Sequence, residues 1–394
     1  MENQFPIETI LEGDNIRESI EHLKKKKTGC GYDGMFGTQL PDFWRKNGEK
    51  IKAQIQNGEY IPIPAVQIRR RKPNGGIRLI EIPSVRDRML QYAMCRVMQP
   101  YYEGVFSVRS FGFRTGRSTL DAVGLCAREM NEGGIYAADL DIKSYFDRVD
   151  QRKLMSLLMQ DTDDPATLGL ISSYLGMRVM SGCHVFRKVV GLPQGGPISP
   201  LLANVYLDQL DRFMEKADLH FIRYADDIVI LCGGEGEAKE TMRRVEEFLN
   251  DSLGLWLNRE KSKLIPAEEL HFLGYGFGCC DGRYYATIGA TEWEKMKKVM
   301  FHNIQKGDEN LIRWWDRLGA YNRGWINYYR NVPLEFLECY TRAMDAAEME
   351  KIHQKCAKHP ELYETALIES KAFIAPLEWY GVVKERYGKN SGEI

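Results

Sequence analysis

The sequence predicts an α+β fold that ends in a helical part. Two segments predict strands. IPIPAVQIRRRKPNGGIRLIEIP (61–83) is typical of two short strands around a Pro-Asn-Gly-Gly turn, and FIRYADDIVIL (221–231) is typical of a tight hairpin. From about residue 291 onward the pattern is helical and rich in aromatic residues at first. Strands and helices followed by helices alone indicate the α+β class.

The other predicted elements follow from local signals. Asn15 suits a helix cap, and Ile16, Ile20 and Leu23 follow it at helical spacing. We predict a strand followed by a helix within GGIYAADLDIKSYFDRV (133–149). The full set of further predictions is a helix over 15–27, a helix near 86–100, a loop over 109–119, an amphipathic helix over 238–255 and a strand over 271–277.

Composition alone favours a metabolic enzyme over a nucleic-acid-binding protein. The 394 residues carry 54 Lys and Arg against 55 Asp and Glu, so the formal charge is −1. The N-terminus has no apolar core of a secretory signal, no stretch reaches the length of a membrane span, and the nine cysteines form no C-x-x-C pair. We therefore expect a cytoplasmic protein with no membrane partner, no disulfide framework and no zinc finger.

The charge is unevenly distributed along the chain. Residues 51–100 carry nine basic residues against three acidic ones, and residues 201–250 carry six basic against eleven acidic. Such a chain is suited to bind polyanions with the first segment and metal ions with the second. Two solvated faces of opposite charge would give the same pattern.

Two acidic clusters indicate a metal site. Asp226 and Asp227 interrupt an apolar hairpin, and adjacent carboxylates that repel each other favour a divalent cation as partner. In the predicted strand before residue 142, alternation places Asp139 and Asp141 on one face. If the clusters converge, they have the ligands for two Mg²⁺ ions. A solvent-exposed acidic turn is the alternative for Asp226 and Asp227.

A series of motifs follows through most of the chain. They are Gly31–Met35, Lys72-x-x-Gly75-x-x-Arg78, Ser110–Arg114, Asp141–Phe146, Gly191–Asn204, Tyr224-Ala225-Asp226-Asp227, Leu257–Ser262, Phe272–Tyr275 and Arg323–Tyr329. In this order they resemble the motifs of a known family, the reverse transcriptases encoded by bacterial group II introns.

The resemblance implies a right-hand polymerase with fingers, a palm with an antiparallel sheet, and a helical thumb. The implied domains are an N-terminal extension of the fingers (1–65), fingers and palm (66–285), and a thumb or maturase-like domain (286–394). The implied activity is RNA-directed DNA polymerisation with two Mg²⁺ ions, for which Mn²⁺ is a candidate substitute. Asp141, Asp226, Asp227 and the backbone carbonyl of Ile142 are the implied metal ligands.

The resemblance also implies roles in nucleotide binding. Lys72 and Arg78 would bind the incoming triphosphate as charge-assisted donors. Phe146 would exclude the 2′-hydroxyl of an rNTP by its bulk. Gln194 and Gly195 would approach the base pair, since glycine lets the backbone come close. Lys261 would protonate the leaving pyrophosphate. For each cation the alternative is a solvated surface residue.

The implied partners are dNTPs and an RNA template with a DNA or RNA primer, and a cognate structured RNA is a further candidate. In segment 311–330 the aromatic residues recur at helical spacing, which predicts a packed stripe rather than a base-stacking surface. The candidate phosphate contacts are Arg114, Arg313, Arg317, Arg323 and Arg330.

The chain departs from the family in two respects. It has no cysteine and histidine pairs of an endonuclease, and it lacks the strongly basic composition of relatives that bind a large intron RNA. Three roles stay open: a polymerase that serves a mobile intron, a domesticated enzyme in phage defence or DNA repair, and an RNA-binding splicing maturase that polymerises little. Intact Asp141, Asp226 and Asp227 weigh against the third.

Overall fold

The chain folds into helices and sheets that form two units. The computed structural model describes residues 4–26, 29–71, 75–306, 311–330, 332–333, 350 and 354. The first unit takes the described residues of Met1–Ser118, Ala138–Ile230 and Lys239–Lys263, and the second takes those of Thr119–Ala137, Leu231–Ala238 and Leu264–Ile394. The predicted α+β class is confirmed. The predicted domain limits at residues 65 and 285 stay a prediction.

The first sheet lies in the first unit and has the strand order β2-β1-β4-β5. β1 and β2 are the two strands predicted within 61–83, and they pair antiparallel with Arg70 opposite Arg78. β1 pairs parallel with β4, which pairs antiparallel with β5. The strands are β1 (Ala65–Arg71), β2 (Ile77–Ile82), β4 (Arg178–Ser181) and β5 (His184–Arg187).

The second sheet has the order β6-β7-β3-β8 and carries the acidic residues. β3 ends at Asp141 and β7, its neighbour, begins at Asp227. The hairpin predicted over 221–231 is β6 and β7, with the turn at Ala225 and Asp226. The strands are β3 (Tyr136–Asp141), β6 (His220–Tyr224), β7 (Asp227–Cys232) and β8 (Lys263–Pro266).

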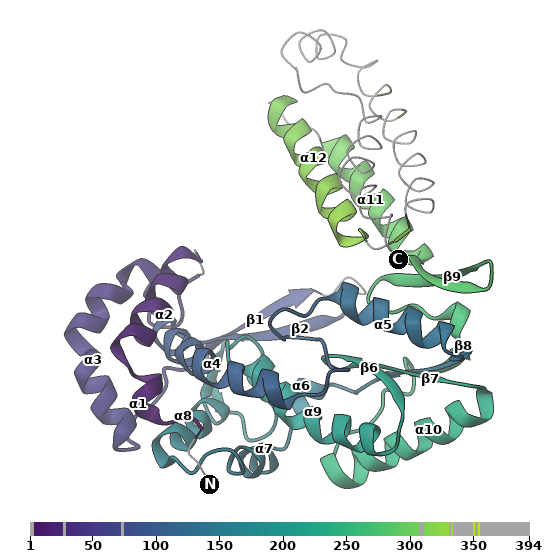
Figure 1. Ribbon diagram of the computed structural model, residues 1–394. Coiled ribbons are helices and arrows are strands. Elements are labelled where there is room, and N and C mark those ends of the chain that lie inside the picture. The colour runs from purple at the N-terminus through teal and green to yellow at the C-terminus, as the bar shows by residue number, and fades with distance from the viewer. Residues whose placement is uncertain are drawn as a thin grey trace. The chain divides into compact units, whose positions relative to one another are not determined.

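Helices pack around these sheets and begin at clear caps. The Ser84 hydroxyl accepts from the Asp87 backbone N–H at the start of α4, and Asp150 and Asp164 cap α7 and α8 in the same way. Figure 1 shows α1, α2 and α3 gathered beside α4. The helices of this part are α1 (Ile7–Ile10), α2 (Gly13–Lys25), α3 (Leu40–Gln56), α4 (Val85–Val105), α6 (Tyr145–Arg148), α7 (Gln151–Leu158), α8 (Pro165–Leu175), α9 (Ser199–Lys216) and α10 (Glu235–Phe248).

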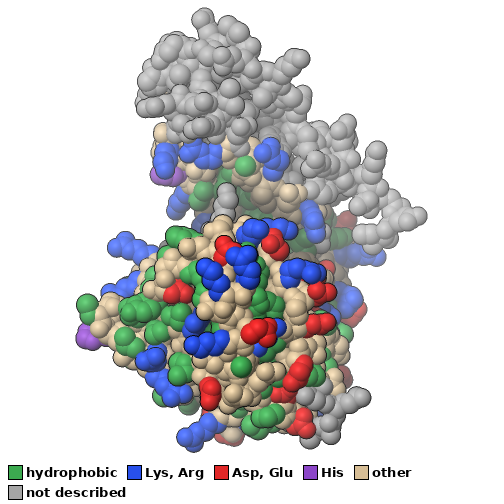
Figure 2. Space-filling view, turned by 90° about the vertical axis from the view of Figure 1, so that its left-hand side faces the viewer, with side chains coloured by type: hydrophobic (Ala, Val, Ile, Leu, Met, Phe, Trp, Pro, Cys, Tyr) green, Lys and Arg blue, Asp and Glu red, His purple; other side chains and the backbone are tan. Residues whose placement is uncertain are grey.

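The surface of α2 and α3 shows how the near-zero net charge is arranged. Each of these helices carries two exposed ion pairs between residues three apart, for example Arg17 with Asp14 and Arg45 with Asp42. In the space-filling view, lysine and arginine side chains alternate with aspartate and glutamate on the face that includes these helices (Figure 2). This face therefore has no uniform charge.

The second unit contains α5, a hairpin and the C-terminal helices. The Asn131 side chain at the end of α5 exchanges two hydrogen bonds with the backbone of Tyr284. α11 and α12 lie side by side (Figure 1). The elements are α5 (Thr119–Asn131), β9 (Tyr275–Cys280), β10 (Arg283–Ile288), α11 (Ala290–Lys306) and α12 (Leu311–Tyr328).

Aromatic side chains tie the end of α12 to the turn before β9. The hydroxyl groups of Tyr328 and Tyr329 donate to the carbonyls of Leu273 (2.7 Å) and Gly274 (3.0 Å). The rings of Tyr275 and Tyr329 lie 4.9 Å apart, and Tyr329 is buried. Tyr328 belongs to the predicted stripe, but it is 40% exposed and is held through its hydroxyl, whereas the stripe members Tyr321 and Trp325 are half-buried.

Several predicted boundaries were wrong. The strand predicted over 271–277 begins only at Tyr275, because Leu273 and Gly274 have positive φ and form a turn. The helix predicted over 238–255 is α10 followed by a π-helical turn over Leu249–Leu253.

The described helices include none long and apolar enough for a bilayer crossing.

A buried arginine holds the β6–β7 hairpin against α9. The Arg223 guanidinium is fully buried, and its Nε donates to Asp211 Oδ1 on α9 at 2.7 Å. Its Nη1 donates to Asn204 Oδ1 at 2.9 Å and to the Ala225 carbonyl at 3.0 Å. Burial raises the pKa of Asp211, and the Arg223 charge opposes that rise. Each charge is buried at a high desolvation cost and depends on the other.

We expect Arg223→Met to lower the free energy of unfolding by about 3–5 kcal/mol, because it leaves Asp211 buried and unpaired. Urea unfolding followed by circular dichroism measures this loss. The double variant Arg223→Met/Asp211→Leu should recover most of it. Arg243→Met, which removes an exposed ion pair of α10, is the matched control and should cost no more than about 1 kcal/mol. Equal losses in Arg223→Met and Arg243→Met would contradict the assignment.

Candidate active site

The turn that carries Asp226 and Asp227 is tightly constrained. Ala225 has a φ of 58°, a conformation that costs a non-glycine residue energy and needs support from its surroundings. Its carbonyl accepts from Arg223. Gly112 packs against the same turn, since a Cβ at Gly112 would lie 2.4 Å from the Ala225 nitrogen. Asn204 binds both residues that support this turn: its side-chain NH2 donates to the Gly112 carbonyl at 2.8 Å, and its side-chain oxygen accepts from Arg223.

Asp141 is held by the segment that precedes β8. The Asn258 side chain donates to Asp141 Oδ1 at 2.9 Å, and the Asn258 backbone N–H donates to the Asp141 carbonyl at 2.7 Å. The Asp141 N–H donates to the Ser262 hydroxyl at 3.1 Å. Lys261 Nζ lies 3.1 and 2.9 Å from the two carboxylate oxygens. Ile142, the fourth predicted ligand, is buried and bridges to Leu257.

The acidic residues of β3 and β7 influence one another electrostatically. The pKa of Asp227 is raised to about 7 by desolvation and by the charges of Asp226, Asp141 and Asp139. Desolvation also raises the pKa of Asp226, and Asp141 adds to that rise. The pKa of Asp139 rises to about 6, mainly by burial, with Asp141 adding to it. Because β3 ends at Asp141 and its neighbour β7 begins at Asp227, these residues lie at the same edge of the second sheet, near enough for their charges to interact.

This arrangement fits a cation. The carboxylates raise one another's pKa, which is the repulsion that a positive charge relieves. Lys261 already provides such a charge at Asp141, and its pKa is raised by that hydrogen bond. No three acidic, histidine or cysteine side chains among the described residues stand close enough to share one metal ion as they are. Substrate phosphates are the usual further ligands of Mg²⁺.

Arg78 is the described member of the predicted triphosphate pair. It lies on β2, and its charge lowers the pKa of Asp226. The charge of Arg78 on the first sheet therefore acts on an acidic residue of the second sheet's hairpin. Lys72, the other predicted member, lies outside the described residues.

Phe146 lies five residues after Asp141, on the short helix α6. Its ring is half-buried and meets the Phe113 ring edge-on, with centroids 6.3 Å apart and planes at 88°. Its carbonyl accepts from the Leu192 N–H at 2.6 Å. The backbone of the Gly191–Asn204 motif is therefore fixed directly to the helix that carries this ring.

Gln194 and Gly195 lie against β2. The Gln194 carbonyl accepts from the Glu81 N–H at 2.7 Å, and its side chain donates to Asp147 Oδ1 at 3.1 Å. Gly195 has a φ of 139°, and a Cβ there would lie 2.5 Å from the Glu81 carbonyl. Only glycine fits this approach.

The predicted nucleic-acid contacts have different environments. The Arg114 side chain is 1% exposed, pairs with Glu103 at 2.9 Å, and donates to the carbonyls of Ser107 and Ser110. We therefore assign Arg114 a structural role in its loop. On α12 and just after it, Arg323 and Arg330 are exposed and Arg317 is half-buried. The side chain of Arg313 lies outside the described part of the chain.

Four residues near this site were missed from the sequence. Asn258 and Ser262 belong to a recognised motif in which only Lys261 was assigned a role. No sequence pattern identifies Glu81 or Lys188. Glu81 on β2 binds Gln194, and Lys188, just after β5, binds the loop before Gln194. Apart from Leu192, which lies four residues after Lys188, their partners lie about 40 to 120 residues away in the sequence, so only the fold identifies them.

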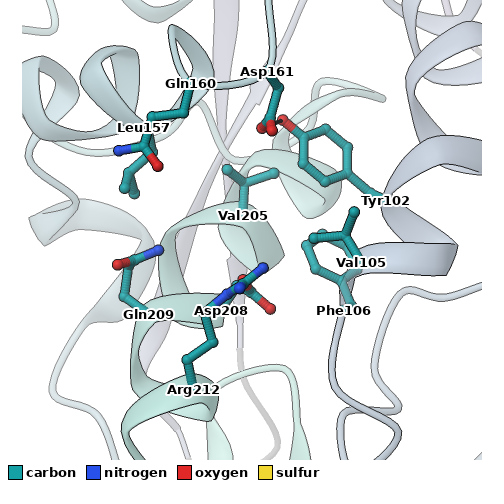
Figure 3. Close-up of a pocket in the computed structure, with 10 residues that line it drawn as sticks. All are labelled: Tyr102, Val105, Phe106, Leu157, Gln160, Asp161, Val205, Asp208, Gln209 and Arg212. Atoms are coloured by element: carbon teal, nitrogen blue, oxygen red, sulfur yellow. Dashed lines mark hydrogen bonds and ion pairs between the residues drawn. The ribbon is translucent and has the colours of Figure 1, made fainter. Parts of the chain in front are cut away.

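A polar cavity of about 290 Å³ lies elsewhere in the first unit, between residues of α4, α7 and α9 (Figure 3). The Tyr102 hydroxyl donates to Asp161 Oδ2 at 2.8 Å on its wall, and Arg212 pairs with Asp208. None of its ten lining residues is among the predicted site residues.

Comparison with known proteins gives a consistent result. Residues 70–277, just over half of the chain, match the family model described as reverse transcriptase (RNA-dependent DNA polymerase). The chain is 28% identical to protein YkfC of Escherichia coli K12, over 62% of this chain and 74% of YkfC. It is 31% identical to the group II intron-encoded protein LtrA of Lactococcus lactis, over 65% of this chain and 43% of LtrA. It thus spans less than half of LtrA.

Among solved structures, one match is a telomerase from Candida albicans in complex with a fragment of telomeric RNA. The identity is 11% and the TM-score 0.47, with 89% of this chain and 69% of that chain covered.

We expect Asp139→Asn to stabilise the protein in EDTA at pH 8 by about 1–3 kcal/mol, with little effect below pH 4. The folded-state pKa of about 6 lies above the usual Asp value of 3.8, so ionisation of Asp139 destabilises the fold as the pH rises between these values. Urea unfolding at both pH values measures the difference. Asp251→Asn, at an exposed aspartate, is the control. An equal effect of Asp139→Asn at both pH values would contradict this interpretation.

Proposed function

The chain belongs to the reverse transcriptase (RNA-dependent DNA polymerase) family, and from this premise we propose that it extends a primer 3′-hydroxyl with dNTPs on an RNA template. The observation that carries the proposal is the meeting of Asp141, Asp226 and Asp227 at one edge of the second sheet. Two neighbouring strands supply these carboxylates, as a polymerase site requires.

Asp141, Asp226 and Asp227 would hold two Mg²⁺ ions, with the Ile142 carbonyl as a further ligand. When bound, the ions would activate the 3′-hydroxyl and neutralise charge on the pyrophosphate. Mn²⁺ would be a substitute. Lys261, which binds Asp141, would donate a proton to the leaving pyrophosphate.

The first sheet and the Gly191–Asn204 loop would bind the nucleotide. Arg78 would donate to the triphosphate, together with Lys72. The Phe146 ring would lie under the sugar, and the Gln194–Gly195 backbone would approach the nascent base pair. Support comes from the nearness of Arg78 to Asp226 and from the hydrogen bond that joins the Phe146 backbone to Leu192.

The biological role proposed is that of a group II intron-type enzyme. LtrA is named as a group II intron-encoded protein, and the motifs of this chain follow the order of that group. Arg323 and Arg330 are exposed and would contact phosphates of the template–primer duplex or of a structured RNA. A stand-alone defence or repair enzyme would share this active site. The two roles are distinguished by whether the RNA transcribed from the flanking DNA folds into an intron ribozyme, which only the intron-type role requires.

Asp226→Asn should lower Mg²⁺-dependent primer extension on an RNA template by at least about 10²-fold, because the amide keeps the shape and removes the charge. Extension of a labelled primer with dNTPs measures the rate. Asp251→Asn is the control and should extend at the wild-type rate. Unchanged extension by Asp226→Asn would refute the site assignment.

Phe146→Ala should lower the preference for dATP over ATP by about 10–100-fold, since a smaller side chain leaves room for the 2′-hydroxyl. The ratio of kcat/KM values for the two nucleotides measures the preference. Phe186→Ala removes an exposed ring of β5 and should leave the ratio unchanged. An unaltered ratio in Phe146→Ala would remove its role in sugar selection.

A further inference from the structure

A buried ion pair between Glu81 and Lys188 is connected to the residues proposed to bind the nucleotide. Glu81 on β2 is 3% exposed. Lys188 follows β5, and its side chain is 14% exposed. Lys188 Nζ lies 3.2 and 3.4 Å from the two Glu81 carboxylate oxygens. A buried ion pair carries a desolvation cost that is often not recovered in stability, so its presence points to a role in fixing one geometry.

The ammonium of Lys188 connects three separate elements. Besides Glu81 on β2, it donates to the Leu192 carbonyl in the loop before Gln194 at 3.1 Å. It also lies 3.4 Å from Asp147 Oδ1 on α6. These partners account for the three protons of the ammonium. Lys188 therefore joins the first sheet, the loop and the helix of the sugar-contacting ring at one point.

Glu81 and Asp147 in turn hold Gln194 at three places. The Glu81 N–H donates to the Gln194 carbonyl at 2.7 Å, and the Glu81 carboxylate accepts from the Gln194 N–H at 3.2 Å. The Gln194 side-chain amide donates to Asp147 Oδ1 at 3.1 Å. Both the backbone and the side chain of Gln194 are thus oriented by residues that bind Lys188.

The elements joined at Lys188 carry the proposed nucleotide contacts. Arg78 lies three residues before Glu81 on β2, and Phe146 precedes Asp147 on α6. We propose that Lys188 and Glu81 are positioning residues that fix Arg78, Phe146 and Gln194 relative to one another and so set the affinity for the incoming nucleotide. This inference rests on the proposed polymerase function. Neither residue touches the nucleotide in this arrangement; both act through the loop and the strand.

The test separates nucleotide affinity from catalysis. Lys188→Met should raise the KM for dNTP by roughly 10-fold or more, because it removes several charge-assisted bonds, with kcat changed less than about 3-fold. The Kd for template–primer should stay unchanged. Lys216→Met, at an exposed lysine of α9, should leave all three constants at wild-type values. Lys188→Arg keeps the charge and should retain much of the affinity.

A double-mutant cycle tests whether Lys188 acts through Glu81. Glu81→Gln removes the charge but keeps an acceptor for the Gln194 N–H. If the two residues act as one unit, the KM of Glu81→Gln/Lys188→Met will resemble that of a single variant rather than the product of both effects. Thermal unfolding of each variant checks the fold. If Lys188→Met does not fold, the comparison of Lys188→Arg and Glu81→Gln with wild type takes its place.

The outcomes distinguish this inference from the proposed function. If the wild-type protein extends primers and Asp226→Asn does not, but the nucleotide KM is unchanged in folded Lys188 and Glu81 variants, the positioning role is refuted and the function stands. A fall in kcat alone refutes it as well. If the wild-type protein fails to extend primers with Mg²⁺, both proposals are refuted.

Discussion

The geometry of the acidic edge depends on the ion pair between Arg223 and Asp211. The turn at Ala225 has a left-handed residue and approaches Gly112 closely, so it would not hold its shape through local preference alone. Arg223 fixes it by binding the Ala225 carbonyl, and Asp211 anchors Arg223 to α9. Because Asp226 follows Ala225 directly, the position of its carboxylate depends on Asp211 of α9, which lies fifteen residues earlier in the chain.

The site then balances repulsion between carboxylates against nearby positive charges, among them Lys261 and Arg78. Asp226 and Asp227 have raised pKa values because they are desolvated beside other carboxylates. Lys261 contacts only Asp141 directly, so the other two carboxylates keep much of their mutual repulsion. Such a cluster is costly in the folded protein, and bound cations would relieve it. The repulsion between these carboxylates therefore both destabilises the folded protein and would favour the binding of metal ions that the proposed reaction needs.

The sequence predicted the parts of this fold that leave a local signature. The β1–β2 pair, the β6–β7 hairpin and α2 follow from alternation, turn residues and helical spacing. α9 was not predicted, because its residues up to Asp211 are nearly all buried and its exposed polar residues lie only in its last part. Among the site residues, the acidic pairs were visible as motifs. Asn258, Ser262, Glu81 and Lys188 were not, since each acts on a residue brought near only by the fold. For Arg114 the motif was recognised and a phosphate contact was predicted, but its buried guanidinium binds carbonyls of its own loop instead.

The near-neutral composition gains a physical meaning from these buried cations. Arg114, Arg223 and Lys188 each bind at least one carboxylate together with a backbone carbonyl of a loop. These carbonyls belong to Ser107 and Ser110, to Ala225, and to Leu192 respectively. Loops lack the hydrogen-bond ladders of helices and strands, so their carbonyls need other donors. A cation provides several donors at one point, and a paired carboxylate offsets the cost of burying it. The near balance of acidic and basic residues thus reflects in part an internal requirement of the fold, which is why net charge alone is a poor guide to the ligands of such a chain.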